Sequence, residues 1–379
     1  MKAEEIFLLD EVCNVEYGTR VVQKRDGGSG YTVYGGGGAT FQMDKFNRED
    51  RIVVARFGMS EECTRFVGGK FFLNDSGLTV SPKSHELLAR FLDYQMLSIN
   101  DSIYALGKGA AQKNLDVPAF RALPLFVPAD TNRQQHIVRI LDEAFAGIAT
   151  AKANAQKNLQ NARALFESHL QDVFSHSEEG WEDKQLGEVC LQITDGKHGD
   201  CNNEASSGFF FLSAKDVRNG TLNYETARQI TKADFEETHR RTNLEPGDIL
   251  ITNSGTIGRM AIAPMDDRTR KTTFQKSVAI LKPIREELDS RFAFYCLSAG
   301  LTRFVNLSAG AAQKNLLLRD LRTYRFMRPN SLGIQKKVAM KLDSLSAETQ
   351  RLESIYQQKL AALDALKKSL LHRAFIGQL

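Results

Sequence analysis

Two Gly-Lys pairs are the first residues to consider for chemistry, because a lysine behind a glycine-rich turn can hold phosphate groups. Gly69-Lys70 and Gly196-Lys197 both lack the upstream glycine that a G-x-x-x-x-G-K-[ST] phosphate loop requires. The glycine run at 35–38 permits close approach of a backbone to a ligand, but a flexible recognition loop or a plain turn explains it without a cofactor. We therefore expect no ATP hydrolysis by this chain and no bound cofactor.

Acidic and thiol side chains point to a nuclease or a metal site, but neither pattern is complete. Glu182-Asp183-Lys184 resembles the end of a nuclease carboxylate–lysine motif, yet it has no partner acid at a suitable spacing. Cys190, His198 and Cys201 lack a fourth ligand and the C-x-x-C spacing of zinc sites. The sequence also lacks the Asn-Pro-Pro or Asp-Pro-Pro tetrapeptide of adenine-N6 methyltransferases. It therefore predicts no catalytic residue and no metal ligand.

Length and composition indicate a folded protein of several domains. At 379 residues, two or three domains are expected. Apolar residues make up 42% and charged residues 25%, and the net charge of +4 does not by itself indicate a nucleic-acid binder. No apolar run approaches the ~20 residues of a membrane span, and the five cysteines form no C-x-x-C pair. We therefore expect a cytoplasmic protein with free thiols and no membrane partner.

An internal duplication organises the chain. The hexapeptide AAQKNL at 110–115 recurs letter for letter at 311–316, and the same register continues to the end of the sequence. Pro128 falls on Pro329, Gln134 on Gln335, and further matches extend through the tails to Phe174 and Phe375. The front halves match more loosely, and the second copy carries roughly two dozen extra residues early in its variable part. A repeat this long is a duplicated domain with its linker rather than a solenoid.

The tails of both copies have the spacing of coiled-coil helices. Apolar or small residues recur at alternating steps of three and four over 133–174, with Lys152 and His169 as interruptions, and again over about 332–375. Asp130 or Thr131 can cap the first helix. A helix of about 40 residues is ~60 Å long at ~1.5 Å per residue and cannot bury its apolar stripe alone. We expect the two tails to pair antiparallel, which would relate the fronts by an approximate two-fold axis. The expected seam positions are Leu141, Phe145, Ile148, Ala155, Leu159, Ala162, Phe166 and Val173, then Val338, Leu342, Leu345, Leu352, Tyr356, Leu363, Leu366 and Leu370.

The fronts have the patterns of mixed α/β (α+β) domains. Short runs of β-forming residues at 52–55, 71–73 and 209–212 are bounded by turn residues. The segments 27–30, 35–38 and 253–256 are expected to be loops. Helices are expected at 86–97 and 288–301, each leading toward one AAQKNL motif.

With its paired AAQKNL motifs, the loop YTVYGGGG at 31–38 and the closing segment LKKSLLHRAFIGQL, the chain resembles the specificity subunits of type I restriction-modification systems. Trp181 through Leu186-Gly187 supplies a Trp-x-x-x-x-Leu-Gly signature in the second copy, which the first copy lacks. The resemblance implies two target-recognition domains joined by two long antiparallel coiled-coil helices with a pseudo-two-fold internal repeat. The expected boundaries are 1–130 and 179–330 for the domains, and 131–178 and 331–379 for the spacer helices.

The resemblance also implies partners and a division of labour. Each target-recognition domain would read one half of a bipartite asymmetric site in double-stranded DNA. Two readers on one face of DNA should sit about one helical turn, ~34 Å, apart, and paired rigid helices make a suitable spacer. Two adenine methyltransferase (modification) subunits and the motor-nuclease (restriction) subunits would perform the chemistry, which for the methyltransferase requires a flipped base.

If the fronts read DNA, polar loop residues are the candidates for base contact, since Lys or Arg suits guanine and Asn suits adenine. The Gln-Lys-Asn part of each AAQKNL motif has two interpretations: it touches phosphate, or it caps and orients the junction. Because both copies keep it, a sequence-independent role is favoured. The DNA-binding candidates are Lys24, Arg25, Tyr34, Gly36 and Lys113 in the first copy, and Lys197, His198, Asn253, Ser254, Thr256 and Lys314 in the second.

The main alternative is a duplicated coiled-coil adaptor that binds proteins and does not read DNA. A self-sufficient nuclease or methyltransferase is disfavoured by the missing motifs described above.

Overall fold

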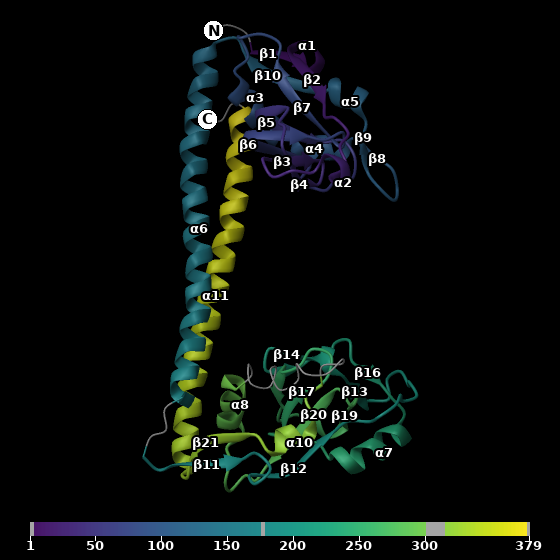
Figure 1. The fold of residues 1–379 in the computed structure, drawn as a ribbon, viewed down its shortest axis with the longest axis vertical. Helices are drawn as coiled ribbons and strands as arrows, with labels where there is room; N and C mark the ends of the chain where they lie inside the picture. Colours follow the sequence, from purple (N-terminus) through teal and green to yellow (C-terminus); the bar gives the residue numbers. More distant parts are fainter. Residues whose placement is uncertain (1–3, 176–178, 301–314, 377–379) are drawn as a thin grey trace. The chain divides into compact units, whose positions relative to one another are not determined.

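The computed structural model describes residues 4–175, 179–300 and 315–376. Its contacts divide the chain into two compact units, one formed by 1–157 with 356–379 and the other by 158–355. We call them unit 1 and unit 2. Each unit therefore combines one globular part with a segment of each of two long helices (Figure 1). Within the described ranges, no helix is both long and apolar enough to cross a membrane.

The long helices are α6 (Thr131–Ser175) and α11 (Leu332–Phe375), close to the predicted ranges. Asp130 caps α6, because its carboxylate accepts the Asn132 backbone N–H at 2.9 Å. In unit 1 the Lys152 Nζ lies 2.6 Å from Asp364 Oδ1, and in unit 2 the Arg163 Nη2 lies 2.9 Å from Glu353 Oε2. The two helices lie side by side and run in opposite directions (Figure 1), so the predicted antiparallel pairing is confirmed.

The seam between the helices follows most of the predicted apolar positions. Leu141, Ile148 and Ala155 on α6 are buried, as is Leu342 on α11. The interruption at Lys152 is explained by its ion pair with Asp364. The prediction for Leu366 was wrong, because this residue is 46% exposed. Near the end of α11 the helix buries Leu371 and Ala374 in the core of unit 1 instead.

The globular part of unit 1 is built on a six-stranded sheet in the order β2-β7-β5-β6-β3-β4. Neighbours are antiparallel except β3 and β6, which run parallel. Helix α3 (Ala89–Ser98) packs on this sheet with six buried residues. The strands are β2 (Cys13–Tyr17), β3 (Tyr31–Gly35), β4 (Gly38–Met43), β5 (Arg48–Ala55), β6 (Thr64–Leu73) and β7 (Gly77–Pro82). A separate pair joins β1 (Glu4–Leu8) to β10 (Pro124–Pro128), and short elements complete the unit: α1 (Leu9–Val12), α2 (Gln23–Asp26), α4 (Asn100–Ala105), β8 (Gly107–Lys108), β9 (Asn114–Leu115) and α5 (Val117–Arg121).

Unit 2 repeats this plan with an insertion. Its four-stranded sheet has the order β12-β20-β17-β18, matching β2-β7-β5-β6, and the parallel pair of β13 with β19 matches β3 with β6. The strand that is continuous in β6 is divided here between β18 and β19. The strands are β12 (Cys190–Asp195), β13 (Phe210–Leu212), β17 (Ile249–Thr252), β18 (Met260–Ile262), β19 (Thr272–Phe274) and β20 (Val278–Pro283), followed by helix α8 (Ser290–Ala299).

Most of the extra residues of the second copy lie between β13 and β17. They form the hairpin β14 (Val217–Arg218) with β15 (Thr221–Leu222) and the helix α7 (Lys232–Thr242). The strand β16 (Arg228–Gln229), which lies between them, pairs with β13 as β4 pairs with β3. Two 3-10 turns, η1 (Ala214–Asp216) and η2 (Thr269–Lys271), lie in the same half. The pair β11 (Trp181–Gln185) with β21 (Arg325–Pro329) and the turn α10 (Leu318–Arg322) close the unit.

The register of the first strand is the same in both copies despite the missing tryptophan. Glu4 lies opposite Pro128 in β10, as Trp181 lies opposite Pro329 in β21. The turn that follows is also repeated, since the Glu11 carboxylate accepts the Leu8 N–H just as Glu188 accepts the Gln185 N–H. The predicted duplication is therefore confirmed down to individual hydrogen bonds.

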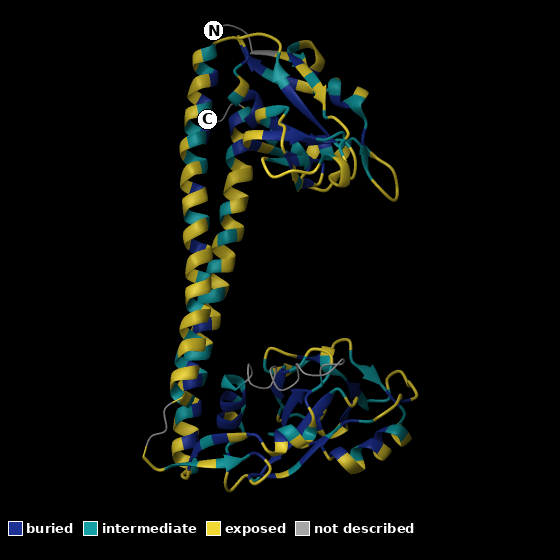
Figure 2. Cartoon of the chain, viewed as in Figure 1, coloured by how far each residue is buried: buried dark blue, intermediate teal, exposed yellow. Residues whose placement is uncertain are grey.

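The two cores are each completed by the end of the helix from the other half of the sequence. In unit 1 the Phe375 ring at the end of α11 lies 5.2 Å from the Phe91 ring on α3. In unit 2 the Phe174 ring at the end of α6 lies 5.4 Å from the Phe292 ring on α8. Figure 2 shows buried residues concentrated in the strands and in α3 and α8, whereas much of the length of α6 and α11 is exposed.

A polar clamp holds each globular part to the helix that follows it. Gln134 is fully buried, and its Nε2 donates to the carbonyls of Glu86 (2.8 Å) and Pro128 (3.0 Å) while its Oε1 accepts the Leu88 N–H (2.9 Å). Gln335 is also fully buried and makes the same three hydrogen bonds in unit 2. The clamp explains why both copies have glutamine here.

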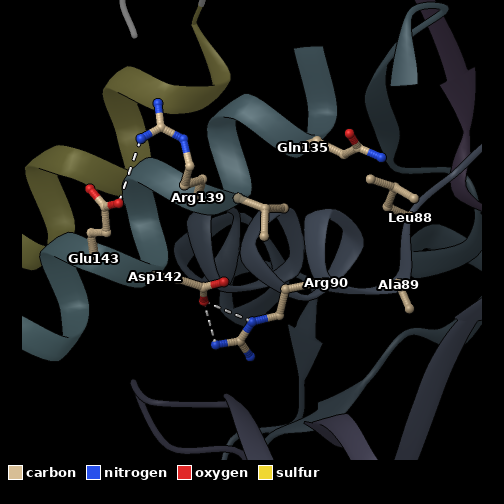
Figure 3. Close-up of a pocket in the computed structure, with 8 residues that line it drawn as sticks. Leu88, Ala89, Arg90, Gln135, Arg139, Asp142 and Glu143 are labelled. Carbon is tan, nitrogen blue, oxygen red and sulfur yellow. Dashed lines mark hydrogen bonds and ion pairs between the residues drawn. The ribbon is translucent and has the colours of Figure 1, made fainter. Parts of the chain in front are cut away.

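A second repeated contact lies beside the clamp, on a more open surface. Asp142 on α6 accepts from Arg90 Nη2 at 2.9 Å and from the Tyr94 hydroxyl, next to an open groove of about 540 Å³ (Figure 3). In unit 2 Asp343 binds Arg291 and Tyr295 in the same way. The groove is lined by Leu88, Ala89, Arg90, Gln135, Val138, Arg139, Asp142 and Glu143.

Candidate nucleic-acid interface

In unit 1 four loops converge where β5 ends, and we call this group the end-loop cluster. It comprises the segment 56–58, the β3–β4 turn at 35–38, the turn at 74–76 and the β8–β9 hairpin at 107–115. Backbone hydrogen bonds join them: Arg56 N–H donates to Ser76 O, and Leu115 N–H donates to Arg56 O, both at 2.8 Å. The cluster is therefore a fixed surface rather than a set of independent loops.

Gly36 lies inside this cluster and is buried. Its N–H donates to Ser76 Oγ at 3.0 Å, and a Cβ at this position would lie 2.6 Å from Phe57 O and 2.9 Å from Ser76 O. A side chain therefore does not fit. Gly37, by contrast, is exposed and has open space around it. The glycine run is explained at Gly36 by close packing of backbones.

Tyr34 packs beside the end-loop cluster. Its ring is half-buried and meets the Phe71 ring edge to face, with 5.6 Å between the ring centroids. Its carbonyl accepts the Asn74 N–H at 2.9 Å, which fixes the turn at 74–76. The structure thus gives Tyr34 a clear packing role at the edge of the candidate interface.

Lys24 and Arg25 lie elsewhere in unit 1, on the one-turn helix α2. Both side chains are exposed, and Arg25 forms an ion pair with the neighbouring Asp26. The loop after α2 is anchored to the end of β4 opposite Gly38, where Gly28 N–H donates to Gln42 O. The structure therefore does not place them in the end-loop cluster.

Lys113 belongs to the β8–β9 hairpin and touches an aromatic ring. Its Nζ lies 3.9 Å from the centroid of Tyr104, and its carbonyl accepts the Met59 N–H at 2.9 Å. The next residue, Asn114, forms a β-bridge with Phe57, and in unit 2 Asn315 forms the equivalent bridge with Ser254. The Gln-Lys-Asn motif thus ties the hairpin to the loop after β5, and Lys113 is partly buried there. Lys314 lies outside the described residues.

The structure adds one group that the sequence did not indicate, a cation beside two aromatic rings. The Arg56 guanidinium lies 4.9 Å from the Tyr17 ring centroid and 4.3 Å from that of Phe57, and Arg56 Nη1 donates to Asp75 O at 3.2 Å. Tyr17 and Phe57 remain 44% and 37% exposed. A partly buried cation beside two exposed aromatic rings suits contact with bases or phosphate. The only sequence signal was the Arg-Phe-Gly triplet directly after β5.

Unit 2 has an equivalent cluster with different side chains. Gly18 and Gly196 occupy the same position, and in both a Cβ would lie 1.9 Å from a backbone oxygen, of Asn74 and Phe274 respectively. Lys197 follows Gly196 and donates to Asp234 at 3.0 Å and Glu237 at 2.9 Å on α7. Glu237 and Asp234 together raise the pKa of Lys197 above its ordinary value. Its ammonium is therefore engaged within the protein.

The inserted helix α7 holds the loop that begins at Gly196. Arg241 donates to the carbonyl and carboxylate of Asp195, and the Asn202 backbone N–H together with the Lys197 ammonium lowers the pKa of Asp234 well below its ordinary range. His198 remains 63% exposed, with Nε2 3.2 Å from Asp195 Oδ2. Of the candidates in this loop, His198 is the one presented to solvent.

Asn253, Ser254 and Thr256 form the loop after β17. Asn253 is only 7% exposed, and its Oδ1 has no hydrogen-bond partner within the described residues. Its carbonyl accepts the Leu316 N–H at 2.8 Å, just as Arg56 O accepts from Leu115. Ser254 is half-buried and Thr256 is exposed, and Gly255 between them has φ +75°. The Asn253 N–H donates to Ser277 O and the Lys276 N–H donates to Lys197 O, both at 3.0 Å, so the structure brings these three residues and the Gly196 loop into one cluster.

The residues considered for a metal site do not share one environment. Cys190 belongs to the main core of unit 2, whereas Cys201 packs with Phe211, Ile230 and Phe235. Burial raises the pKa of the Cys190 thiol to about 12. Both thiols are therefore core residues of separate clusters.

The sequence of this chain matches a known family and several of its members. The family model described as type I restriction modification DNA specificity domain matches residues 1–160 and 178–361. The EcoBI specificity subunit of Escherichia coli is 26% identical over 178 residues, covering 46% of this chain and 36% of that protein. The StySPI specificity subunit of Salmonella potsdam is 23% identical over 297 residues, covering 74% of this chain and 62% of that protein. The matches thus span between about a third and three fifths of these relatives.

A solved structure shows the same fold over the whole chain. That structure concerns the structural basis of complex assembly and conformational transition of the type I R-M system. The match has a TM-score of 0.78 at 16% identity and covers 100% of this chain and 99% of the other.

Proposed function

Because the chain belongs to the type I restriction-modification DNA specificity family, we propose that it reads a bipartite, asymmetric site in double-stranded DNA and carries no active site of its own. Target-recognition domains at 1–130 and 179–330 would each read one half of the site. Spacer helices at 131–178 and 331–379 would set their separation. We expect the complex to act in the cytoplasm.

The observation that carries this proposal is the pair of end-loop clusters. In both clusters the first residue after the strand accepts the same backbone hydrogen bond, from Leu115 to Arg56 in unit 1 and from Leu316 to Asn253 in unit 2. They present different side chains on that construction. A repeated frame with changed side chains is what two readers of different half-sites require.

Chemistry would come from partner proteins. We infer two adenine methyltransferase subunits and the motor-nuclease subunits as partners, and no cofactor or metal bound by this chain. The adaptor alternative is not favoured, because the family model covers both globular parts as well as much of the helices. Within the proposal, Lys24, Arg25, Tyr34, Gly36, Lys113, Lys197, His198, Asn253, Ser254, Thr256 and Lys314 remain the candidate DNA contacts. Among the candidates within or beside the two clusters, His198 and Thr256 are exposed and Lys113 is partly buried, whereas Gly36 and Asn253 would act through the loops they shape.

The test is methylome sequencing of host cells with and without this gene, with the partner subunits expressed. We expect one bipartite motif containing methylated adenine to disappear on deletion. Persistence of every such motif would contradict the proposal. The purified chain alone should show neither methyl transfer nor DNA cleavage.

A further inference from the structure

The backbone of Arg56 is fixed on both sides at the surface of unit 1. Its N–H donates to Ser76 O and its carbonyl accepts the Leu115 N–H, so the residue joins the 74–76 turn to the β8–β9 hairpin. It directly follows the buried end of β5. The backbone of this residue is therefore fixed in position, which direct readout of a base edge requires.

The Arg56 side chain is also held in place, and its positive charge is not paired with a carboxylate. The Tyr17 and Phe57 rings flank the guanidinium, and one of its five N–H groups donates to Asp75 O. Within the described residues, Arg56 forms no ion pair, so no carboxylate neutralises its charge, as is also the case for Arg51 and Arg65 of the same unit. A stacked guanidinium keeps its remaining donors in a fixed fork, which matches two acceptors on one base edge.

The other copy shows that this position is variable while its frame is constant. The residue with the same backbone hydrogen bond in unit 2 is Asn253, which is buried. The Gln-Lys-Asn motif, in contrast, is identical in both copies. A contact to phosphate, needed equally by both halves, is expected at a constant position, and a contact to a base at a changed one.

We propose that Arg56 is a specificity-determining residue that donates two hydrogen bonds to the O6 and N7 atoms of a guanine in the half-site read by unit 1. This inference rests on the proposed function. Tyr17 and Phe57 are positioning residues that hold the guanidinium. The half-site of unit 2 is read without an arginine at this position.

The test uses the chain in complex with its methyltransferase subunits and duplexes carrying the motif found by methylome sequencing. Each guanine of the motif is replaced in turn, and binding is measured by fluorescence anisotropy at several salt concentrations. We expect one replacement to weaken wild-type binding by about 5- to 150-fold and to leave Arg56→Ala binding unchanged. On the cognate duplex Arg56→Ala should lose a similar factor, with an unchanged salt slope.

Controls separate the possible failures. Lys45→Ala removes another exposed charge of unit 1, in the loop between β4 and β5, and should retain the full discrimination. Arg56→Lys keeps the charge but not the fork, so it should lose discrimination even if Arg56→Ala fails to fold. A motif with no guanine in either half, or an equal loss on all duplexes with a salt slope reduced by about 0.9, overturns the assignment. A wild-type complex with no sequence preference would instead contradict the proposed function itself, before any variant is tested.

Discussion

The buried glutamine clamp gives a quantitative prediction for the stability of each unit. Gln134→Leu removes three hydrogen bonds and leaves backbone groups of Glu86, Leu88 and Pro128 without partners, the one of Pro128 buried and the other two partly buried. At about 1–1.5 kcal/mol for each lost hydrogen bond, the free energy of unfolding of this part of unit 1 should fall by about 3–4.5 kcal/mol. Because Gln335 makes the same three bonds, Gln335→Leu should cost unit 2 a similar amount.

Hydrogen–deuterium exchange with mass spectrometry can measure this loss in each unit separately. Gln134→Leu should speed exchange of the Leu88 amide by at least about 100-fold and leave the Asp289 amide unchanged. Gln335→Leu should do the reverse. The matched control is Gln135→Leu, which alters the next, exposed residue of α6 and should change stability by less than about 0.5 kcal/mol. If Gln134→Leu behaved like Gln135→Leu, the reasoning from buried polar groups would be refuted.

Three further predictions concern the surface and core of the chain. Lys113→Ala with Lys314→Ala should weaken binding to all DNA sequences alike and reduce the salt slope by up to about 2; an unchanged slope in a salt titration would exclude phosphate contact. Burial raises the pKa of Asp93 to about 7, so the folded state binds the proton more tightly than the unfolded chain and wild-type stability should fall as pH rises from about 4 to 7; Asp93→Asn should flatten that dependence in urea titrations at pH 5 and 8, and parallel curves for the two proteins would contradict it. Gly36→Ala should destabilise unit 1 by about 1–3 kcal/mol because its Cβ meets two backbone oxygens, whereas Gly37→Ala should be neutral; equal thermal melting temperatures for the two variants would show that the turn can adapt.

The sequence was sufficient to predict features that depend on local periodicity. The spacing of apolar residues defined α6 and α11 almost to their ends, and Asp130 was a recognisable cap. The duplication predicted that both halves share one construction, which the hydrogen bonds of Gln134 and Gln335 confirm. These features need only short-range pattern and an internal comparison.

Features that depend on long-range pairing were not predictable. Lys197 has the composition of a free loop cation, and only the packing of α7, some forty residues later in the chain, engages it with two carboxylates. Tyr17 meets Arg56 because β2 and β5 both pair with β7, which no local pattern encodes. Leu366 fits the heptad spacing but is exposed, since its neighbours near the helix end turn toward the core of unit 1 instead.

The way α11 completes the core of unit 1 has a consequence for biosynthesis. The core of unit 1 includes Leu371 and Ala374, and the Phe375 ring contacts Phe91 on α3; the ribosome adds these three residues only after all of unit 2 has been translated. Unit 2 receives its equivalent cover, Phe174, before its own strands are made. The first domain to leave the ribosome is therefore the last one to have its hydrophobic core completed. A nascent chain that stalls before α11 is finished would carry an open apolar surface that chaperones and proteases can recognise, so a sealed first domain would report that synthesis has reached the end of α11.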